Sequence, residues 1–251
     1  VMQQQDALRI AMWSGPRNIS TAMMRAWENR DDTAVCDEPF YAYYLDNVDT
    51  RHPLHDEVIA AGETDWKRVV GAMTAAPPGG KAIFYQKQMT HHFLPEIDRS
   101  WLARVTNCFL IRHPRDVLLS YIKKRDTATS EDIGFPQQLE IFDYVAAATG
   151  TAPVVIESTD VLKNPRGMLT ALCQRLGVDF TERMLQWPQG PRESDGVWAP
   201  HWYASVYDST GFAPYWPGSG SLPPELEAVL DVCLPIYERL YSYRLAPAAA
   251  H

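Results

Sequence analysis

The strongest constraint on the fold is a repeated alternation of short apolar segments with segments of helical pattern. Apolar runs predict buried strands at residues 8–13, 33–36, 81–86, 106–111 and 154–156. Helical patterns and their end signals predict helices at about residues 18–30, 65–75, 114–125, 132–148, 165–176 and 224–243. Strands that alternate with helices form right-handed βαβ units. The sequence therefore predicts an α/β fold of three layers, with a central, mostly parallel sheet in a single domain spanning residues 1–251.

Charge and composition narrow the classes of partner. The formal net charge of −8 disfavours nucleic acid and anionic membrane surfaces, so neither is an expected partner. No apolar run reaches the length of a membrane span, and no signal-peptide pattern is visible. The four cysteines match no zinc-site spacing, so we expect no metal site, and unpaired thiols favour a cytoplasmic location. The sequence leaves a monomer and a homodimer open.

The first predicted strand runs into a turn of small residues and then into a helix. Free backbone N–H groups and the helix dipole at such a turn attract an anion. Arg17 adds a fixed charge that can bind a phosphate or sulfate through two hydrogen bonds, and Ser20 and Thr21 add hydroxyl donors. The alternative is structural: Asn18 or Ser20 caps the helix, and Arg17 is a surface residue.

This turn is not the Walker A loop of ATP- and GTP-binding proteins. In the pattern GxxxxGK[ST] counted from Gly15, Ser20 takes the place of the second glycine and Thr21 that of the lysine. A magnesium–nucleotide triphosphate site of the usual kind is therefore disfavoured.

The fourth predicted strand ends in a second basic motif. Arg112 follows the strand directly, and Ser120 lies eight residues later, about two turns into the next helix. The carboxyl ends of parallel strands are the usual ligand-binding edge of such a sheet, and both motifs lie there.

Together the two segments resemble the PAPS-dependent sulfotransferases, where PAPS is 3′-phosphoadenosine 5′-phosphosulfate. Residues 16–21 (PRNIST) are similar to the family's 5′-phosphosulfate loop PKSGTTW, and residues 112–121 (RHPRDVLLSY) are similar to its 3′-phosphate motif RNPRDVxxSY. Residues 164–178 resemble the helix after a later core strand of the family. The resemblance covers about residues 7–180. It implies a P-loop-like sulfotransferase fold and transfer of a sulfuryl group from PAPS to a hydroxyl or amine of a small-molecule acceptor.

The resemblance also implies roles for individual residues. Arg17 replaces the family's lysine and would hold the 5′-phosphosulfate, and Arg112 and Ser120 would hold the 3′-phosphate. The other residues of the loop that would contact the donor are Gly15, Pro16, Asn18, Ser20 and Thr21.

The chain departs from the family pattern at two places. Ile19 lies where many members have glycine. The family's basic C-terminal loop is missing, since no lysine or arginine occurs between Arg192 and Arg239. The backbone near Ser209, Thr210 and Gly211, or Arg192 itself, would have to bind the 3′-phosphate instead.

On the acceptor side, the transfer benefits from a general base. Glu38 follows the second predicted strand, in the place of a Glu-Pro element in some carbohydrate sulfotransferases. We expect Pro39 to keep the Glu38 backbone extended, and burial and a nearby anion to raise the carboxyl pKa. The alternative interpretation is a carboxylate at a helix start. Competing bases are the histidines His52, His55, His91 and His92, of which His55 and His92 join Glu38 and Arg17 as candidate catalytic residues.

Residues 187–222, here called the lid segment, contain half of the tryptophans, with several tyrosines, prolines and glycines. Their rings are expected either to line an acceptor pocket or stack on adenine, or to fix an irregular segment to the core. Two other functions stay open: an ATP-using phosphotransferase on a related fold, and a non-catalytic protein that binds a nucleotide or anion.

Overall fold

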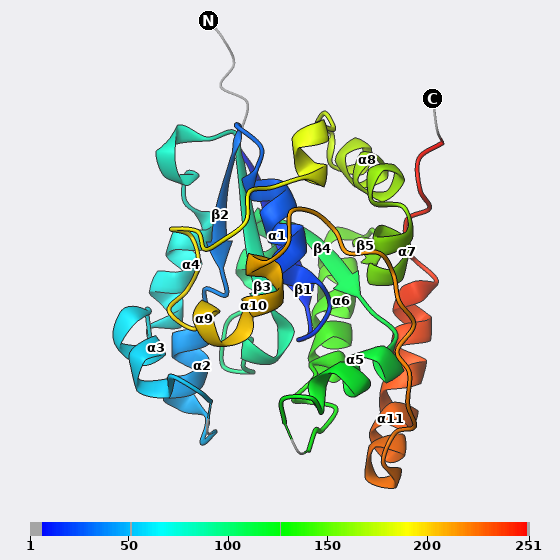
Figure 1. Ribbon diagram of the computed structural model, residues 1–251. Helices are drawn as coiled ribbons and strands as arrows, with labels where there is room; N and C mark the ends of the chain where they lie inside the picture. Colours follow the sequence, from blue (N-terminus) through cyan, green and yellow to red (C-terminus); the bar gives the residue numbers. More distant parts are fainter. Residues whose placement is uncertain (1–6, 51, 126, 250–251) are drawn as a thin grey trace, which may run out of the picture.

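The computed structural model describes residues 7–50, 52–125 and 127–249. Its centre is a five-stranded sheet in the order β2-β3-β1-β4-β5, and all neighbouring strands are parallel (Figure 1). The strands are β1 (Leu8–Ser14), β2 (Thr33–Asp37), β3 (Ile83–Met89), β4 (Thr106–Ile111) and β5 (Val154–Glu157). The predicted parallel α/β sheet is confirmed, and the third strand ends three residues later than the apolar run indicated.

Six helices match segments of helical pattern: α1 (Ser20–Glu28), α4 (Trp66–Thr74), α5 (Pro114–Tyr121), α6 (Phe135–Thr149), α8 (Pro165–Leu176) and α11 (Pro224–Tyr241). Five short helices were not predicted: α2 (Tyr41–Asn47), α3 (His55–Ala61), α7 (Ser158–Lys163), α9 (Ala199–Trp202) and α10 (Ala204–Tyr207). Short 3₁₀ segments are η1 (Pro78–Gly80), η2 (Thr90–His92), η3 (Ser100–Arg104) and η4 (Glu182–Leu185). The unpredicted helices are at most seven residues long, too short to show a clear hydrophobic period.

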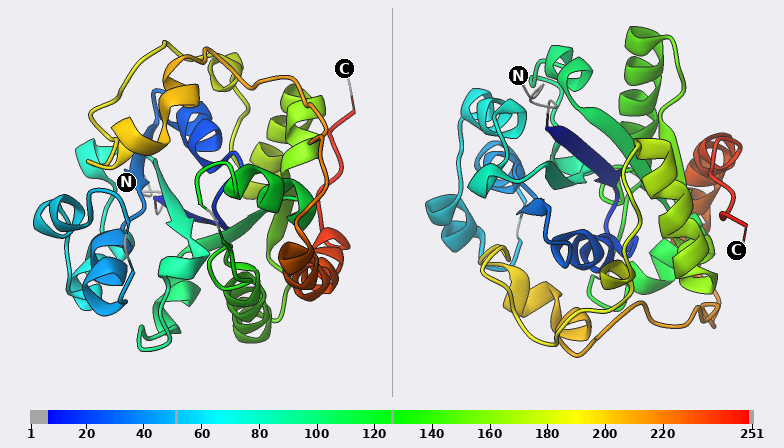
Figure 2. Two further views of the ribbon diagram at one scale, coloured as in Figure 1. Left: turned by 60° about the horizontal axis from the view of Figure 1, so that its bottom comes forward. Right: turned by 90° about the horizontal axis from the view of Figure 1, so that it is seen from above.

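Two hydrophobic cores cover the two faces of the sheet. Successive side chains of a strand point to opposite faces, so in β1 Met12 packs into one core and Trp13 into the other. The Met12 core is closed by α1 and α8, and the Trp13 core by α4, α5, α6 and α11 (Figure 2). The three-layer arrangement follows, because each central strand has an apolar residue for either face.

The ends of four strands meet at one edge of the sheet. Because all five strands are parallel, the loop after β1, Glu38 after β2, η2 after β3 and Arg112 after β4 lie at the same, carboxyl edge. The sequence expectation that both basic motifs lie there is confirmed.

The lid segment carries the short helices α9 and α10 and packs onto this framework through some of its rings. Trp187 and Trp198 are buried in hydrophobic clusters, whereas Trp216 is 82% exposed. Some rings therefore attach the segment to the core, as one interpretation expects, and others, described below, line a cavity. Across the described parts of the chain, no helix combines the length and apolar character that crossing a membrane requires.

Candidate active site

The loop between β1 and α1 has an unusual backbone. Arg17 and Ile19 have φ angles of 65° and 58°, in the left-handed region that costs a non-glycine residue about 1–2 kcal/mol. Gly15 allows a close approach, since a Cβ atom there would lie 2.2 Å from the Ile133 carbonyl oxygen. The left-handed Ile19 explains why this position suits glycine in related loops. Strain of this kind persists only where the surroundings hold it, and it gathers at binding sites.

The predicted side-chain cap of α1 is wrong. The cap residue is Ile19, which cannot form a side-chain hydrogen bond. Asn18 instead donates from Nδ2 to the Leu110 carbonyl, 3.2 Å away, and so attaches the loop to the end of β4. The first N–H groups of α1 therefore have no side-chain cap and are available to an anion.

Three hydrogen bonds connect this loop to the second motif and to β5. Arg17 Nε donates to Ser120 Oγ over 2.9 Å, and Arg112 Nη1 donates to the Arg17 carbonyl over 2.7 Å. Ser158, the first residue of α7 directly after β5, donates to the Asn18 carbonyl over 3.0 Å. The two basic motifs thus form one structural unit.

Within the described residues, no carboxylate neutralises the charges of this unit. Neither Arg17 nor Arg112 forms an ion pair with a carboxylate among residues 7–50, 52–125 and 127–249. Burial and, secondly, the Arg112 charge lower the pKa of Arg17. Ser20 and Thr21 are largely buried residues that line a cavity, and their hydroxyls form no hydrogen bond within the described chain. Such a site favours an anion with several oxygen atoms.

A cavity of about 350 Å³ extends from this unit to the end of β2. Its lining includes residues of the two basic motifs and their surroundings, namely residues 16–22, Arg112, Ser120, Leu162, Ser209, Gly211 and Ala213. It also includes Glu38, Tyr41, Tyr44, His52, Lys87, Met89, His91, His92, Tyr121, Lys124, Arg125, Asp132, Trp202, Tyr203, Ser205 and Val206. The first group is called the donor end below, and the second the acceptor end, after the roles that the sequence resemblance implies for Arg17 and Glu38.

Most predicted site residues line this cavity, and four do not. Gly15 and Thr210 are not part of the lining, although their neighbours Pro16, Ser209 and Gly211 are. Arg192 is directed to the Pro188 carbonyl and lies near Glu28, so it does not take the place of a basic C-terminal loop. His55 bonds to Asp56 over 2.9 Å and faces the Leu45 carbonyl, because it lies in the first turn of α3. The structure thus does not support His55 as a candidate base.

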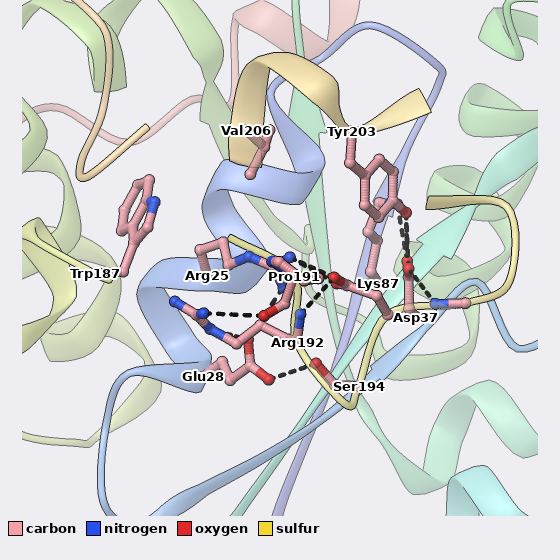
Figure 3. Close-up of polar contacts among 12 residues, drawn as sticks. Arg25, Glu28, Asp37, Lys87, Trp187, Pro191, Arg192, Ser194, Tyr203 and Val206 are labelled. Carbon is pink, nitrogen blue, oxygen red and sulfur yellow. Dashed lines mark hydrogen bonds and ion pairs between the residues drawn. The ribbon is translucent and has the colours of Figure 1, made fainter. Parts of the chain in front are cut away.

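At the acceptor end, Glu38 belongs to a buried network of charges. Lys87 Nζ lies 2.6 Å from Glu38 Oε1, 2.9 Å from Asp37 Oδ1 and 2.5 Å from the Tyr203 hydroxyl. Asp37 and Lys87 are paired residues of the neighbouring strands β2 and β3. Figure 3 shows Tyr203 and Lys87 converging on Asp37.

The backbone of Glu38 differs from the prediction. Its φ angle is 46°, so the expectation that Pro39 keeps it extended is wrong. The Glu38 carbonyl accepts a hydrogen bond from Tyr41 N over 3.0 Å, which closes a turn into α2. Burial is the main cause that raises the pKa of Glu38, and Asp37 adds to it, while Lys87 and Tyr203 oppose it. The expected direction of the shift is confirmed, with burial as the leading cause.

The histidines form an aromatic wall beside Glu38. The His92 ring lies between Tyr41 and Tyr44, with centroid distances of 4.5 and 4.8 Å. Burial lowers the pKa of His52 to about 4, that of His91 to about 3 and that of His92 well below the ordinary value. These imidazoles are therefore neutral at pH 7, and a base with so low a pKa is weak.

Sequence reasoning did not identify Lys87 as part of the site. It included Tyr203 only as one ring of the lid segment that could line an acceptor pocket, and it gave the tyrosines of α2 no role. The α2 segment has no clear period, and Tyr203 lies about 165 residues from Glu38 in the sequence. The sequence offered one signal: a lysine directly after one predicted strand and two carboxylates directly after another. These residues pair only if the two strands are neighbours in the register that the structure shows. No group of three or more His, Cys, Asp or Glu side chains in the described ranges could hold a metal ion.

Comparison with known proteins gives the family. A family model described as "Sulfotransferase domain" matches residues 8–243. The chain is 31% identical over 231 residues to a protein of Arabidopsis thaliana named "Branched-chain-amino-acid aminotransferase-like protein 2". The matched region is 92% of this chain but only 41% of that protein, so the chain spans less than half the length of this relative.

Two solved structures share the fold. The sulfotransferase domain of the Synechococcus PCC 7002 olefin synthase has a TM-score of 0.57 at 16% identity, covering 97% of this chain and 98% of that one. The sulfotransferase from Alicyclobacillus acidocaldarius has a TM-score of 0.54 at 11% identity, covering 94% of both. With the match of the family model over nearly the whole chain, the sequence and the fold show that this chain belongs to the sulfotransferase domain family.

Proposed function

We propose that this chain is a PAPS-dependent sulfotransferase that transfers a sulfuryl group to a hydroxyl of a small-molecule acceptor. The observation that carries the proposal is the contact of Arg17 with Ser120, beside Arg112, at one end of a cavity whose other end holds Glu38. An anion site and a buried carboxylate within one cavity suit a group transfer that needs charge stabilisation and a base.

The donor end fits PAPS in charge and in hydrogen-bonding groups. Arg17, the free hydroxyls of Ser20 and Thr21 and the uncapped N–H groups of α1 would hold the 5′-phosphosulfate. Arg112 and Ser120 would hold the 3′-phosphate. When bound, PAPS would supply the activated sulfuryl group and the 5′-phosphate leaving group.

Arg17 and Arg112, which have no carboxylate partner among the described residues, would supply the positive charge that the family obtains in part from a C-terminal basic loop. Ser209 contributes little through its side chain, because its hydroxyl already accepts from Trp187 Nε1 and donates to the Val206 carbonyl. The donor end therefore depends on Arg17 and Arg112 more than on the lid segment.

The acceptor end would orient and deprotonate the hydroxyl. Glu38 Oε1 is bound by Lys87, which leaves Oε2 to accept the hydroxyl proton. The stacked rings of Tyr41, His92 and Tyr44 form a wall with no charge at neutral pH, and they help exclude water. Arg17 would stabilise the negative charge that grows on the leaving phosphate.

The location and assembly of the protein stay proposals. We propose a cytoplasmic enzyme with no nucleic-acid or membrane partner, which the net charge of −8 and the four free cysteines support. A homodimer stays open beside a monomer.

The test is a thermal-shift comparison of PAP, PAPS, ADP, ATP and sulfate, where PAP is the product 3′-phosphoadenosine 5′-phosphate. A ligand that binds only the native state raises the melting temperature. PAP should stabilise the protein clearly more than ADP, because only PAP carries the 3′-phosphate that Arg112 and Ser120 would bind. Equal shifts for PAP and ADP would favour the ATP-using alternative, and PAP binding without turnover of any acceptor would favour the non-catalytic one.

A matched pair of variants tests whether the difference in stabilisation between PAP and ADP arises at Arg112. Arg112→Ala should remove most of the difference between PAP and ADP. Arg115→Ala should keep it, because Arg115 donates to the Gly220 carbonyl and does not line the cavity. Two variants with the same loss would show that the effect is not specific to the donor end.

A further inference from the structure

We propose that Lys87, Asp37 and Tyr203 are positioning residues for Glu38. Lys87 binds one oxygen of Glu38 and leaves the other for the acceptor, while Asp37 and Tyr203 hold Lys87 in place and make this arrangement depend on docking of the lid segment. The inference rests on the proposed function in one respect, that Glu38 is the base. The three residues act through Glu38 and need not touch the acceptor themselves.

The hydrogen bonds of Lys87 are fully used. An ammonium group has three donors, and Lys87 Nζ has three acceptors within 2.9 Å: Asp37 Oδ1, Glu38 Oε1 and the Tyr203 hydroxyl. The Lys87 side chain is 2% exposed, so no water replaces these partners. The ammonium position, and with it the position of Glu38 Oε1, is therefore fixed.

The hydroxyl of Tyr203 determines which groups of the network donate hydrogen bonds and which accept them. It accepts from Lys87 Nζ and from Trp198 Nε1, the latter over 3.1 Å. With both acceptor positions used, its own proton goes to Asp37, whose Oδ2 lies 2.7 Å away. Glu38 Oε1, at 3.3 Å, receives the Lys87 proton instead.

The second oxygen of Glu38 has no hydrogen bond to any residue that the structure describes. It lies 3.9 Å from His92 Nδ1, too far for one, and Glu38 lines the cavity. The charged or titratable groups around Glu38 are Asp37 on β2, Lys87 on β3, Tyr41 on α2, His92 on η2 and Tyr203 on the lid segment. Of these, His92 is neutral at pH 7 because burial lowers its pKa.

Two carboxylates share one ammonium in this network. The side chains of Asp37 and Lys87 are 1% and 2% exposed, and that of Glu38 is 11% exposed. Removing the ammonium would leave two adjacent buried carboxylates, one of which would bind a proton. Removing the Asp37 charge would leave Lys87 to Glu38 alone and would favour its ionised form. The two changes therefore act on Glu38 in opposite directions.

The lid segment contacts this network at two residues and is itself bonded to α1. Tyr203 lies between α9 and α10, and Gly196 N donates to Asp37 Oδ2 over 3.4 Å. The neighbouring Asp195 forms a buried ion pair with Arg25 of α1 over 2.7 Å, and Ser194 donates to Glu28 (Figure 3). Glu38 is thus held as described only while the lid segment is docked on α1.

The first experiment measures the ionisation of Glu38 without using turnover. In protein labelled with ¹³C at the glutamate carboxyl carbons, the Glu38 signal is assigned by its loss in Glu38→Gln and then titrated with pH. Lys87→Met should move the Glu38 midpoint up by at least about one pH unit, and Asp37→Asn should move it down. Lys87→Arg, which keeps the charge, should lie near the parent and remains testable if Lys87→Met does not fold. Shifts in the same direction, or no shift, overturn the proposal.

The second experiment links the network to turnover. At saturating donor, the acidic limb of the kcat–pH profile should follow the Glu38 midpoint. It should move to higher pH in Lys87→Met and to lower pH in Asp37→Asn. Tyr203→Phe should lower kcat by about tenfold or more, with the KM for PAPS unchanged. Tyr215→Phe, also in the lid segment but outside the cavity lining, is the matched control. A Tyr203→Phe enzyme with parental kcat overturns the link to the lid segment.

The two proposals fail in different ways. If PAP stabilises the protein and turnover is found, but the Glu38 midpoint ignores Lys87 and Asp37, the function stands and the positioning network is wrong. If PAP does not stabilise the protein, the proposed function is wrong, whatever the Glu38 titration shows.

Discussion

Arg17 and Ser120 lie 103 residues apart in the sequence, yet Arg17 Nε donates to Ser120 Oγ over 2.9 Å. The bond joins the strained loop after β1 to the second turn of α5. With Arg112 bonded to the Arg17 carbonyl, each motif holds a charged group of the other in place. A bound anion would enter a site whose donors are already arranged, which lowers the ordering cost of binding.

The first prediction concerns the Arg17 charge. Arg17→Ala should fold normally and lose turnover by orders of magnitude, because removing one preorganised donor to a developing charge costs about 3–4 kcal/mol of barrier. Arg17→Lys should keep part of the activity, since it keeps the charge but loses the bond to Ser120. Measured kcat within about tenfold of the parent in Arg17→Ala would mean that the loop is only a helix start, tenfold being about 1.4 kcal/mol.

The second prediction separates Glu38 from the histidines as the base. Glu38→Gln should bind PAP as the parent does and lose about a hundredfold or more of its turnover at saturating donor. The variants His52→Gln, His91→Gln and His92→Gln should lose less, because burial lowers the pKa of each imidazole. Collapse of turnover in a histidine variant, with Glu38→Gln near the parent, would contradict the assignment.

The third prediction is that turnover is independent of metal ions. The loop is not a Walker A loop, and the described residues offer no cluster of metal ligands. Assays with and without EDTA should therefore give the same rate. A strict requirement for magnesium would count against the sulfotransferase mechanism and for a nucleotide triphosphate donor.

The fourth prediction concerns the ion pair that holds the lid segment on α1. Arg25 and Asp195 are 1% and 5% exposed, and without Asp195 the buried Arg25 keeps only its pair with Glu28, at 3.2 Å. Asp195→Ala should therefore lower the free energy of unfolding by about 3 kcal/mol, the lower end for breaking a buried pair, measured by denaturant titration. Glu182→Ala is the control: its pair with Arg166 is more than half exposed and should contribute under about 1 kcal/mol. Equal losses would show that the lid segment is not held by this pair.

The fifth prediction is a loss of stability in acid. Burial lowers the pKa of His52 to about 4 and that of His91 to about 3, whereas the unfolded value is about 6.5. Between these values the unfolded state binds more protons, so the free energy of unfolding falls as pH falls from about 6.5 towards 4. His91→Gln should show a shallower fall than the parent, measured by denaturant titration over this pH range. A steeper fall in His91→Gln would contradict the neutral aromatic wall.

Local sequence determined the sheet, the main helices and the donor end. The apolar run 106–111 coincides with β4, and Pro114 begins α5, because period and end signals act over a few residues. The basic motifs could be placed at one edge of the sheet since parallel strands put their carboxyl ends together. The details of the loop were less predictable: the expected Asn18 or Ser20 cap is replaced by a left-handed Ile19, which tertiary contacts with β4 and β5 hold in place.

Only the tertiary structure decided the acceptor end. Glu38 was identified from its place after a strand, but its left-handed backbone and its bond to Lys87 depend on the register of β2 against β3. His55 and His92 looked equivalent in sequence, yet one faces Asp56 outside the cavity and the other is stacked between two tyrosines. Tyr203 comes from a segment whose path is set by a buried ion pair and not by any local pattern. Contacts between residues so far apart leave no periodic signal in the chain, because they are selected by the packing of whole elements.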